Sequence, residues 1–379
     1  MRSRSWDIFC KVVDNYGDAG VCWRLARQLA HDYQQSVRLW VAGLDALCPL
    51  NPAIDTALDI QHCDGVEVRR WSDPFPIVEP REIVVATFGC DLPGGFVAAM
   101  AIRDPHPVWI NFEYLSAEQW VEGCHRLPSP HPRLPLIQYF YFPGFTARTG
   151  GLLLERGLIE TRDAFQRDAA EKQSFWQTLG LPAPAHDELR VSLFCYPAAP
   201  VAALAEAWAR SAQPITCIVP EGVPAPAVTG NLKVHAIPFL SQSDYDRLLW
   251  ACDLNFVRGE DSFVRAQWAA VPLVWQIYPR HDGAHLIKLK TFLDLYCARL
   301  PLDAAAALRN FCEAWNGVAL PPASWPRLQQ HLAILKPHAA AWAQRLAQLN
   351  NLAGGLVEFC EERLQYAPSE TPFSKQVLS

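Results

Sequence analysis

The segment Asp14-Asn15-Tyr16-Gly17-Asp18-Ala19-Gly20 carries two carboxylates four residues apart on a turn that contains two glycines. Paired carboxylates can accept a proton or bind a cationic group. The preceding run from Trp6 to Val13 is apolar and β-branched, which predicts a strand. A helix is predicted after the turn, because apolar residues recur there at helical spacing: Val21, Cys22, Leu25, Leu29 and Ala30. Such a turn faces the crevice beyond the carboxyl ends of a parallel sheet, where α/β enzymes bind their ligands.

A structural interpretation of the two aspartates stays open at this point. Aspartate is common in turns, and either Asp14 or Asp18 can cap the following helix. Gly17 and Gly20 add little, because glycine permits tight turns anywhere. The residue types alone therefore weigh structure and catalysis about equally.

A second polar loop, Arg258-Gly259-Glu260-Asp261-Ser262, separates a predicted strand at 253–257 from a predicted helix at 262–270. The exposed N–H groups of that helix, with Ser262 and the forked guanidinium of Arg258, suit a diphosphate. Glu260 and Asp261 would repel a diphosphate, so we expect them to face a sugar or an acceptor. Both carboxylates also fit a plain role in stabilising the helix dipole, and Ser262 fits a plain role as the cap.

Aromatic side chains near the ends of other predicted strands form a candidate slot for a nucleotide base. Phe194 and Tyr196, with Phe239 and Gln242, can stack and hydrogen bond with a base, although such aromatics more often belong to the core. Past the strand at 273–277, Tyr278, Arg280 and Asp282 are further cleft candidates. His281 and His285 have a spacing compatible with a metal, but no acidic metal motif accompanies them, and we predict no metal site.

The composition limits the classes of function. A chain of 379 residues favours two domains of roughly 100 to 200 residues each. A net charge of −6, with 39 acidic and 33 basic residues, argues against a nucleic-acid or anionic membrane surface and suits a basic partner protein. The amino terminus lacks an apolar signal segment, so we expect a soluble, cytoplasmic protein whose 12 cysteines are buried thiols.

The order of predicted elements indicates two α/β domains, at 1–180 and 181–364, with a polar tail at 365–379. Two such domains facing a cleft suggest the GT-B arrangement of glycosyltransferases, with two Rossmann-like domains. A dehydrogenase lacks support because no GxGxxG follows a strand, and a periplasmic binding protein lacks support because no export signal is present. Strands are predicted at 6–13, 37–42, 66–71, 83–88, 108–112, 136–140, 189–194, 215–219, 232–237, 253–257 and 273–277, and helices at 163–179, 202–211, 241–251 and 262–270.

Four segments together closely resemble the EarP family, the bacterial arginine rhamnosyltransferases of elongation factor P. They are DNYGDAG, NFEYLSAEQWV, FLSQSDYDRLLWACDLNFVRGEDSFVRAQWA and VPLVWQIYP. The resemblance implies a GT-B fold, an acceptor-binding N-terminal domain, a nucleotide-sugar-binding C-terminal domain and a dTDP-β-L-rhamnose donor. It also implies inverting transfer to one arginine of elongation factor P, without a metal or other cofactor.

The resemblance carries roles to individual positions. Asp18 corresponds to the general base, Asp14 to a group that orients the guanidinium, and Glu260 to a third essential carboxylate. Asn15, Tyr16 and Gly17 form the acceptor-side loop. The loop Arg280-His281-Asp282-Gly283 departs from the more acidic stretch that we expect there. Positions expected to bind the donor are Phe194, Tyr196, Phe239, Gln242, Arg258, Asp261, Ser262 and Tyr278.

Two other interpretations remain open from the residues alone. The chain fits a GT-B transferase with another nucleotide sugar or acceptor. It also fits a nucleotide-binding adaptor that holds a basic protein without catalysis, although the presence of all three candidate carboxylates speaks against an inactive protein.

Overall fold

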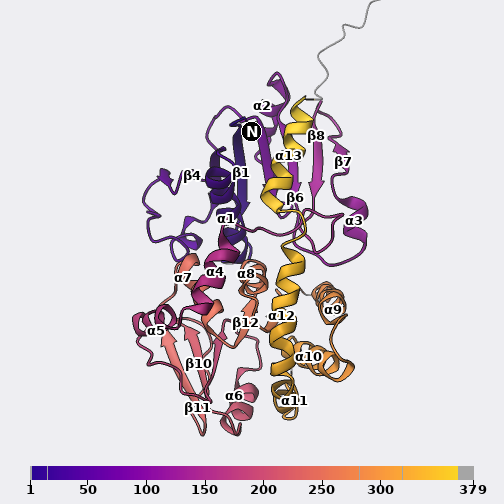
Figure 1. Ribbon diagram of the computed structural model, residues 1–379. Helices are drawn as coiled ribbons and strands as arrows, with labels where there is room; N and C mark the ends of the chain where they lie inside the picture. Colours follow the sequence, from indigo (N-terminus) through magenta and orange to yellow (C-terminus); the bar gives the residue numbers. More distant parts are fainter. Residues whose placement is uncertain (1, 15, 281, 318, 366–379) are drawn as a thin grey trace, which may run out of the picture.

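The computed structural model describes residues 2–14, 16–280, 282–317 and 319–365. The N-terminal domain is built on an eight-stranded sheet (Figure 1), whose central strands are parallel and whose two edge strands are antiparallel. In spatial order the strands are β3 (Ile60–Cys63), β4 (Val66–Arg70), β2 (Ser36–Ala42), β1 (Ser5–Lys11), β5 (Ile83–Thr87), β6 (Val108–Phe112), β8 (Ile137–Tyr141) and β7 (Pro128–Pro130).

Helices cover both faces of this sheet. One apolar core packs α1 (Gly17–Asp32) and α13 (Leu352–Gln365) against the strands, and a second core packs α2 (Gly94–Ile102) against the other face. The central strands are buried on both sides, which explains their continuous apolar sequence. Short helical segments follow β2 and β6, namely η1 (Leu44–Ala46) and α3 (Trp120–Cys124).

The C-terminal domain contains a five-stranded parallel sheet, in the order β11 (Leu232–Ile237), β10 (Ile215–Pro220), β9 (Leu189–Leu193), β12 (Leu254–Arg258) and β13 (Leu273–Gln276). Its helices are α4 (Leu158–Arg167), α5 (Ala169–Thr178), α6 (Val201–Ala209), α7 (Gln242–Ala251), α8 (Asp261–Ala269), α9 (Ala284–Cys297), α10 (Leu302–Trp315), α11 (Ser324–Gln330) and α12 (Leu332–Leu346). In both sheets the first strand of the domain lies at a switch in strand order, which is where open α/β sheets form a ligand crevice.

The chain crosses between the domains twice, and the two crossings lie side by side. Leu152 and Asn351 form a parallel bridge, and the Leu352 N–H donates to the Leu152 carbonyl at 3.0 Å. After the second crossing, α13 continues from the end of α12 onto the N-terminal domain (Figure 1). The chain is therefore interwoven between the domains.

The predicted strands are confirmed, and three expectations are corrected. The short edge strands β3 and β7 were missed, and the predicted helix at 163–179 is two helices, α4 and α5, joined at Asp168, whose side chain caps α5. The domain limits after 180 and 364 do not follow the packing, because α4 and α5 bury Phe165, Phe175 and Trp176 in the C-terminal core while α13 completes the N-terminal core. The predicted tail lies outside the described residues beyond 365.

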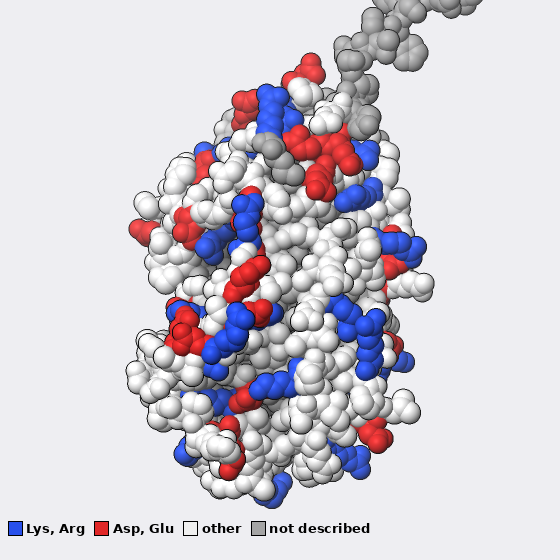
Figure 2. Space-filling view, in the orientation of Figure 1, with Lys and Arg blue, Asp and Glu red and all other residues white. Residues whose placement is uncertain are grey.

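Acidic and basic side chains are interspersed over the face shown in Figure 2, without a large field of one sign. Within the described ranges, no helix has both the length and the apolar character needed to span a membrane. All twelve cysteines belong to the described part of the chain, where each is a free thiol.

Candidate active site

The first acidic segment joins β1 to α1 at the carboxyl edge of the N-terminal sheet. Asp18 lies in the first turn of α1 and is 3% exposed. Its Oδ2 accepts the backbone N–H of Val13 at 2.8 Å and of Asp14 at 2.9 Å. The helix begins after Tyr16 without a side-chain cap, so the capping interpretation of the two aspartates is wrong. Asp18 instead fixes the loop that carries Asp14.

Asp14 reaches across the cleft to the C-terminal domain. Its Oδ2 accepts the Tyr196 hydroxyl at 2.6 Å. A side chain at either of two glycines would displace this carboxylate, because a Cβ at Gly17 would lie 2.5 Å from Oδ2 and a Cβ at Gly259 would lie 2.6 Å from it. Gly259 also has a φ of +61°, which side chains rarely adopt. The interdomain contact therefore depends on the absence of two side chains.

The second acidic segment joins β12 to α8 and sends its two carboxylates in different directions. Glu260 faces the N-terminal domain, where its Oε2 accepts the Leu115 N–H at 3.1 Å, and Lys288 Nζ lies 4.0 Å from its Oε1. Asp261 turns toward α1, and its Oδ1 accepts from Arg24 Nε at 2.7 Å. Neighbouring carboxylates thus belong to different environments.

Ser262 is not the side-chain cap of α8, because Glu260 occupies that position without a capping hydrogen bond. The Ser262 hydroxyl donates to the Arg258 carbonyl and accepts the Arg258 N–H at 3.1 Å. It therefore closes the loop on itself. No side chain of this loop caps the first N–H groups of α8. These groups can therefore receive an anion.

Two adjoining pockets meet at Asp14 and Gly17, which line both of them. We name them the carboxylate pocket and the aromatic pocket. The carboxylate pocket brings together Asp14, Asp18, Glu260, Tyr114, Tyr278 and Lys288. The aromatic pocket is lined by Tyr16, Phe194, Tyr196, Phe239, Gln242, Arg258, Asp261 and Ser262, among others.

Arg258 lies over the aromatic rings of its pocket. Its guanidinium carbon is 4.3 Å from the centre of the Phe194 ring and 4.7 Å from that of Tyr196, and Nη1 donates to the Cys195 carbonyl at 3.1 Å. These contacts hold a positive charge beside the start of α8. On the other side, Phe239 packs against Tyr16 with ring centres 4.9 Å apart.

The carboxylates of the carboxylate pocket bind protons more strongly than usual. Burial raises the pKa of Asp14 and of Asp18 above the ordinary value for aspartate. Burial raises the pKa of Glu260 to about 7, where the positive charge of Lys288 opposes the shift and the two aspartates add to it. Perturbed acids in a cleft are typical of a reactive site or a cation site.

The structure brings the described members of the predicted site together, with two differences in grouping. Tyr16, expected in the acceptor-side loop, lines the aromatic pocket. Tyr278, expected among the donor residues, lines the carboxylate pocket, where its ring meets that of Tyr196 at 5.6 Å. Arg280 also lines this pocket and pairs with Asp282 at 2.9 Å. Asn15 and His281 lie outside the described residues. In the described ranges, no group of three His, Cys, Asp or Glu side chains has an arrangement suited to a metal ion.

The residues of the two pockets that were not predicted include Tyr114, Arg24 and Lys288. Tyr114 follows β6 by two residues, so its place after a predicted strand was a usable signal. Arg24 lies on the apolar face of α1, where a buried arginine indicates a specific partner. Lys288 lies on α9, and no local pattern distinguishes it from an ordinary surface lysine.

Comparison with known proteins places this geometry in a family. The profile of the family described as Elongation-Factor P (EF-P) rhamnosyltransferase EarP matches residues 6–361. A protein-arginine rhamnosyltransferase of Pseudomonas putida is 44% identical over 95% of this chain and 99% of its own length. Its counterpart in Pseudomonas aeruginosa is 44% identical over 94% of this chain and 98% of its own length.

Solved structures agree with this assignment. A structure described as the structural basis for EarP-mediated arginine glycosylation of translation elongation factor EF-P is 33% identical to this chain. It covers 95% of this chain and 99% of its own, with a TM-score of 0.66. A UDP-glucose:anthocyanidin 3-O-glucosyltransferase, 11% identical with a TM-score of 0.53 over 95% of this chain and 98% of its own, shares the fold alone. The chain has the GT-B glycosyltransferase fold and belongs to the EarP family of elongation factor P rhamnosyltransferases.

Proposed function

We propose that this protein transfers L-rhamnose from dTDP-β-L-rhamnose to one arginine of elongation factor P, with inversion at the anomeric carbon. The observation that carries the proposal is the carboxylate pocket, in which Asp14 and Asp18 from one domain and Glu260 from the other line one space. This pocket adjoins an aromatic pocket that contains Arg258 and the start of α8. A negatively charged site thus lies beside a site suited to a nucleoside diphosphate.

The donor fits the aromatic pocket by its chemistry. Phe194 and Phe239 offer apolar faces for the thymine, and the Gln242 amide offers hydrogen bonds to its polar edge. The diphosphate would bind at the start of α8 beside Arg258 and Ser262. Tyr278, in the neighbouring pocket, would contact the sugar. The anomeric carbon would then lie near Asp14, where the two pockets meet.

The acceptor guanidinium fits the carboxylate pocket by charge. Free arginine has a pKa of about 13, so deprotonation before attack at pH 7 would cost roughly 8 kcal/mol. Carboxylates that bind the cation, align one nitrogen and accept its proton during bond formation avoid that separate step. Burial, which raises the pKa of Asp18, makes it a better proton acceptor.

We assign a role to each carboxylate. Asp18 accepts the proton. Asp14, which is held by the Tyr196 hydroxyl, orients the guanidinium. Glu260 binds the same cation from the other domain. A nitrogen–carbon bond forms at the anomeric carbon as the carbon–oxygen bond to dTDP breaks. The leaving group takes the electron pair, and its charge is stabilised by Arg258 and α8. One displacement inverts the centre, and no step calls for a metal or other cofactor.

An acceptor assay tests the proposal. The protein is mixed with dTDP-β-L-rhamnose and elongation factor P, and the acceptor is weighed and fragmented by mass spectrometry. We expect one added deoxyhexose on one arginine, and NMR of the product should show the inverted anomer. An unchanged acceptor mass with an active donor would reject the proposal, and transfer only from another nucleotide sugar would correct the donor. Because elongation factor P is a translation factor, this activity belongs in the cytoplasm.

A further inference from the structure

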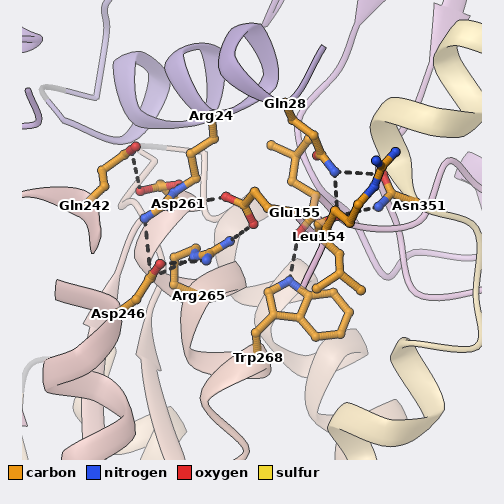
Figure 3. Close-up of polar contacts among 12 residues, drawn as sticks. Arg24, Gln28, Leu154, Glu155, Gln242, Asp246, Asp261, Arg265, Trp268 and Asn351 are labelled. Atoms are coloured by element: carbon orange, nitrogen blue, oxygen red, sulfur yellow. Dashed lines mark hydrogen bonds and ion pairs between the residues drawn. The ribbon is translucent and has the colours of Figure 1, made fainter. Parts of the chain in front are cut away.

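A cluster of charged side chains joins the two domains (Figure 3), and two of its members, Arg24 and Asp261, line the aromatic pocket. Arg24 extends from α1 of the N-terminal domain toward α7 and α8 of the C-terminal domain. Its Nε donates to Asp261 at 2.7 Å, and its Nη2 lies 3.5 Å from Asp246 Oδ1. Arg24 is 4% exposed, so these interactions are shielded from water.

The cluster holds more carboxylates than cations. Arg265 forms a two-point contact with Asp246 at 2.8 and 2.7 Å and a further contact with Glu155 at 2.6 Å. Arg24 Nη1 also donates to Glu155 Oε1 at 3.4 Å, so Glu155 lies between the two guanidinium groups. Among the described residues, Arg24 is the cation that hydrogen bonds to Asp261.

Asp261 occupies a position where an uncompensated charge would harm donor binding. It is the first residue of α8, whose N-terminal N–H groups are the candidate diphosphate site, and it lines the aromatic pocket. A carboxylate there repels a diphosphate unless a cation balances it. With Arg24 in place, the aromatic pocket contains two carboxylates, of Asp14 and Asp261, and two guanidinium groups, of Arg24 and Arg258.

The approach of α1 to α8 is tight enough to fix this pairing. A Cβ at Gly20, one turn before Arg24, would lie 3.0 Å from the Asp261 carboxyl carbon. Gln242 Nε2 donates to the Gly20 carbonyl at 3.2 Å and to Asp261 Oδ2 at 3.4 Å. Gln242, one of the proposed base-binding residues, is thus also held against α1.

We propose that Arg24 is a positioning residue of the donor site, which acts from the opposite domain by holding Asp261 and balancing its charge so that the aromatic pocket accepts a nucleoside diphosphate. The inference rests on the proposed function and deepens it. The helix that presents Asp18 to the carboxylate pocket also completes the donor site. Donor affinity therefore depends on the contact between α1 and α8, in addition to the residues of the C-terminal domain.

Titration calorimetry with dTDP on the full chain tests this role. Arg24→Gln should weaken dTDP binding about thirtyfold or more, since loss of one partner of a buried charge pair leaves the other charge unbalanced. Arg24→Lys keeps the charge and should lose less. Arg27→Gln is the matched control: it lies one turn further along α1 and pairs with Asp64 of the same domain at 3.2 Å, so its dTDP affinity should equal that of the wild type.

The double variant Arg24→Gln/Asp261→Asn separates charge balance from simple loss of structure. Removal of both charges should recover at least about tenfold in dTDP affinity relative to Arg24→Gln. In turnover assays, Arg24→Gln should raise the donor KM by a larger factor than it lowers kcat.

Two results would overturn the role of Arg24: dTDP affinity of Arg24→Gln equal to that of the wild type, or a folded double variant that recovers nothing. Circular dichroism and the unfolding midpoint verify folding. If Arg24→Gln does not fold, Arg24→Lys decides the matter: a folded Arg24→Lys that binds dTDP about thirtyfold more weakly than the wild type, while Arg27→Gln binds it normally, would exclude a charge role. Wild-type protein that binds no dTDP would instead reject the proposed donor and the inference with it.

Discussion

The two acidic loops lie on either side of the cleft, one after β1 and the other after β12, yet their carboxylates lie in different surroundings. In the N-terminal loop, Asp14 and Asp18 both line the carboxylate pocket. In the C-terminal loop, Glu260 joins them there, while Asp261 turns away to Arg24. The carboxylate pocket thus contains three carboxylates, whereas in the aromatic pocket Arg24 balances the charge of Asp261.

The difference shows how opposite charges can be bound a short distance apart. A cationic acceptor needs carboxylates that lack strong cationic partners, and an anionic donor needs the reverse. The chain achieves both with adjacent residues of one loop, because consecutive side chains at the start of α8 point in different directions. The following experiments test that division between the pockets.

Asp18→Asn should have the largest effect. It removes the proposed proton acceptor, so kcat should fall about a thousandfold while dTDP affinity stays unchanged. Steady-state kinetics and calorimetry measure the two quantities. Asp45→Asn, an exposed aspartate of the same domain, serves as the control. Wild-type turnover by Asp18→Asn would remove Asp18 from the role of base.

Gly259→Ala should cause the second-largest loss of activity, because the new side chain disturbs the contact between the two acidic loops. The added Cβ would lie 2.6 Å from Asp14 Oδ2 and 2.9 Å from the Tyr196 hydroxyl. Displacement of Asp14 should lower kcat/KM about a hundredfold. Gly222→Ala is the matched control, since Gly222 also has a positive φ, of +81°, but a Cβ there meets no atom within 4 Å. Equal losses in both variants would attribute the effect to backbone strain alone.

Glu260→Gln should lower kcat/KM about thirtyfold by removing one charge that binds the acceptor cation. The wild-type rate should rise with pH as Glu260 ionises near pH 7, and this rise should be absent from Glu260→Gln. Rate profiles of both proteins between pH 5.5 and about 8.5 make the comparison. Glu206→Gln, an exposed substitution on α6, is the control.

Glu260→Gln should lower activity but raise the free energy of unfolding above neutral pH. The folded-state pKa of Glu260 lies above its unfolded value, so the folded state binds more protons between about pH 4.5 and 7. Any stabilisation from this group is complete below the unfolded pKa and is lost as the pH rises through 7. Glu260→Gln should therefore gain up to about 3 kcal/mol over wild type at pH 8, and much less at pH 5. Denaturant unfolding at both pH values measures the gain, and an equal change at both would contradict the shifted pKa.

Tyr196→Phe should have the smallest effect. It removes one hydrogen bond to Asp14, which is expected to lower kcat/KM about fivefold. The loss should vanish in an Asp14→Asn background, because the partner is already gone. An additive loss would show that Tyr196 acts by another route.

The sequence indicated most of the fold because the interior strands are continuous apolar runs bounded by turn residues. β3 and β7 were missed because they are short edge strands with polar or proline residues, such as His62 and Pro128. The domain limits failed for another reason. Local patterns identify helices but do not say onto which sheet a helix will pack, and α4, α5 and α13 each pack with the domain that the order of the chain does not suggest.

The candidate site was predictable where residues directly follow strands. Asp14 and Glu260 follow β1 and β12, and Arg258 is the last residue of β12, which places all three at the crevice. The divergence of Glu260 and Asp261 was not predictable, because it depends on Arg24 and Lys288, which reach the site from distant helices. Such contacts depend on how distant elements pack, between the two domains for Arg24 and within the C-terminal domain for Lys288.

The exchange of helices between the domains has a consequence for synthesis. Leu352, Leu356 and Phe359 of α13 are buried in the core of the N-terminal domain. A ribosome that makes the chain in order exposes these residues only after the whole C-terminal domain. Until then the sheet formed by β1 to β8 has one apolar face incompletely covered. The N-terminal domain is therefore the first to be translated and the last to be completed.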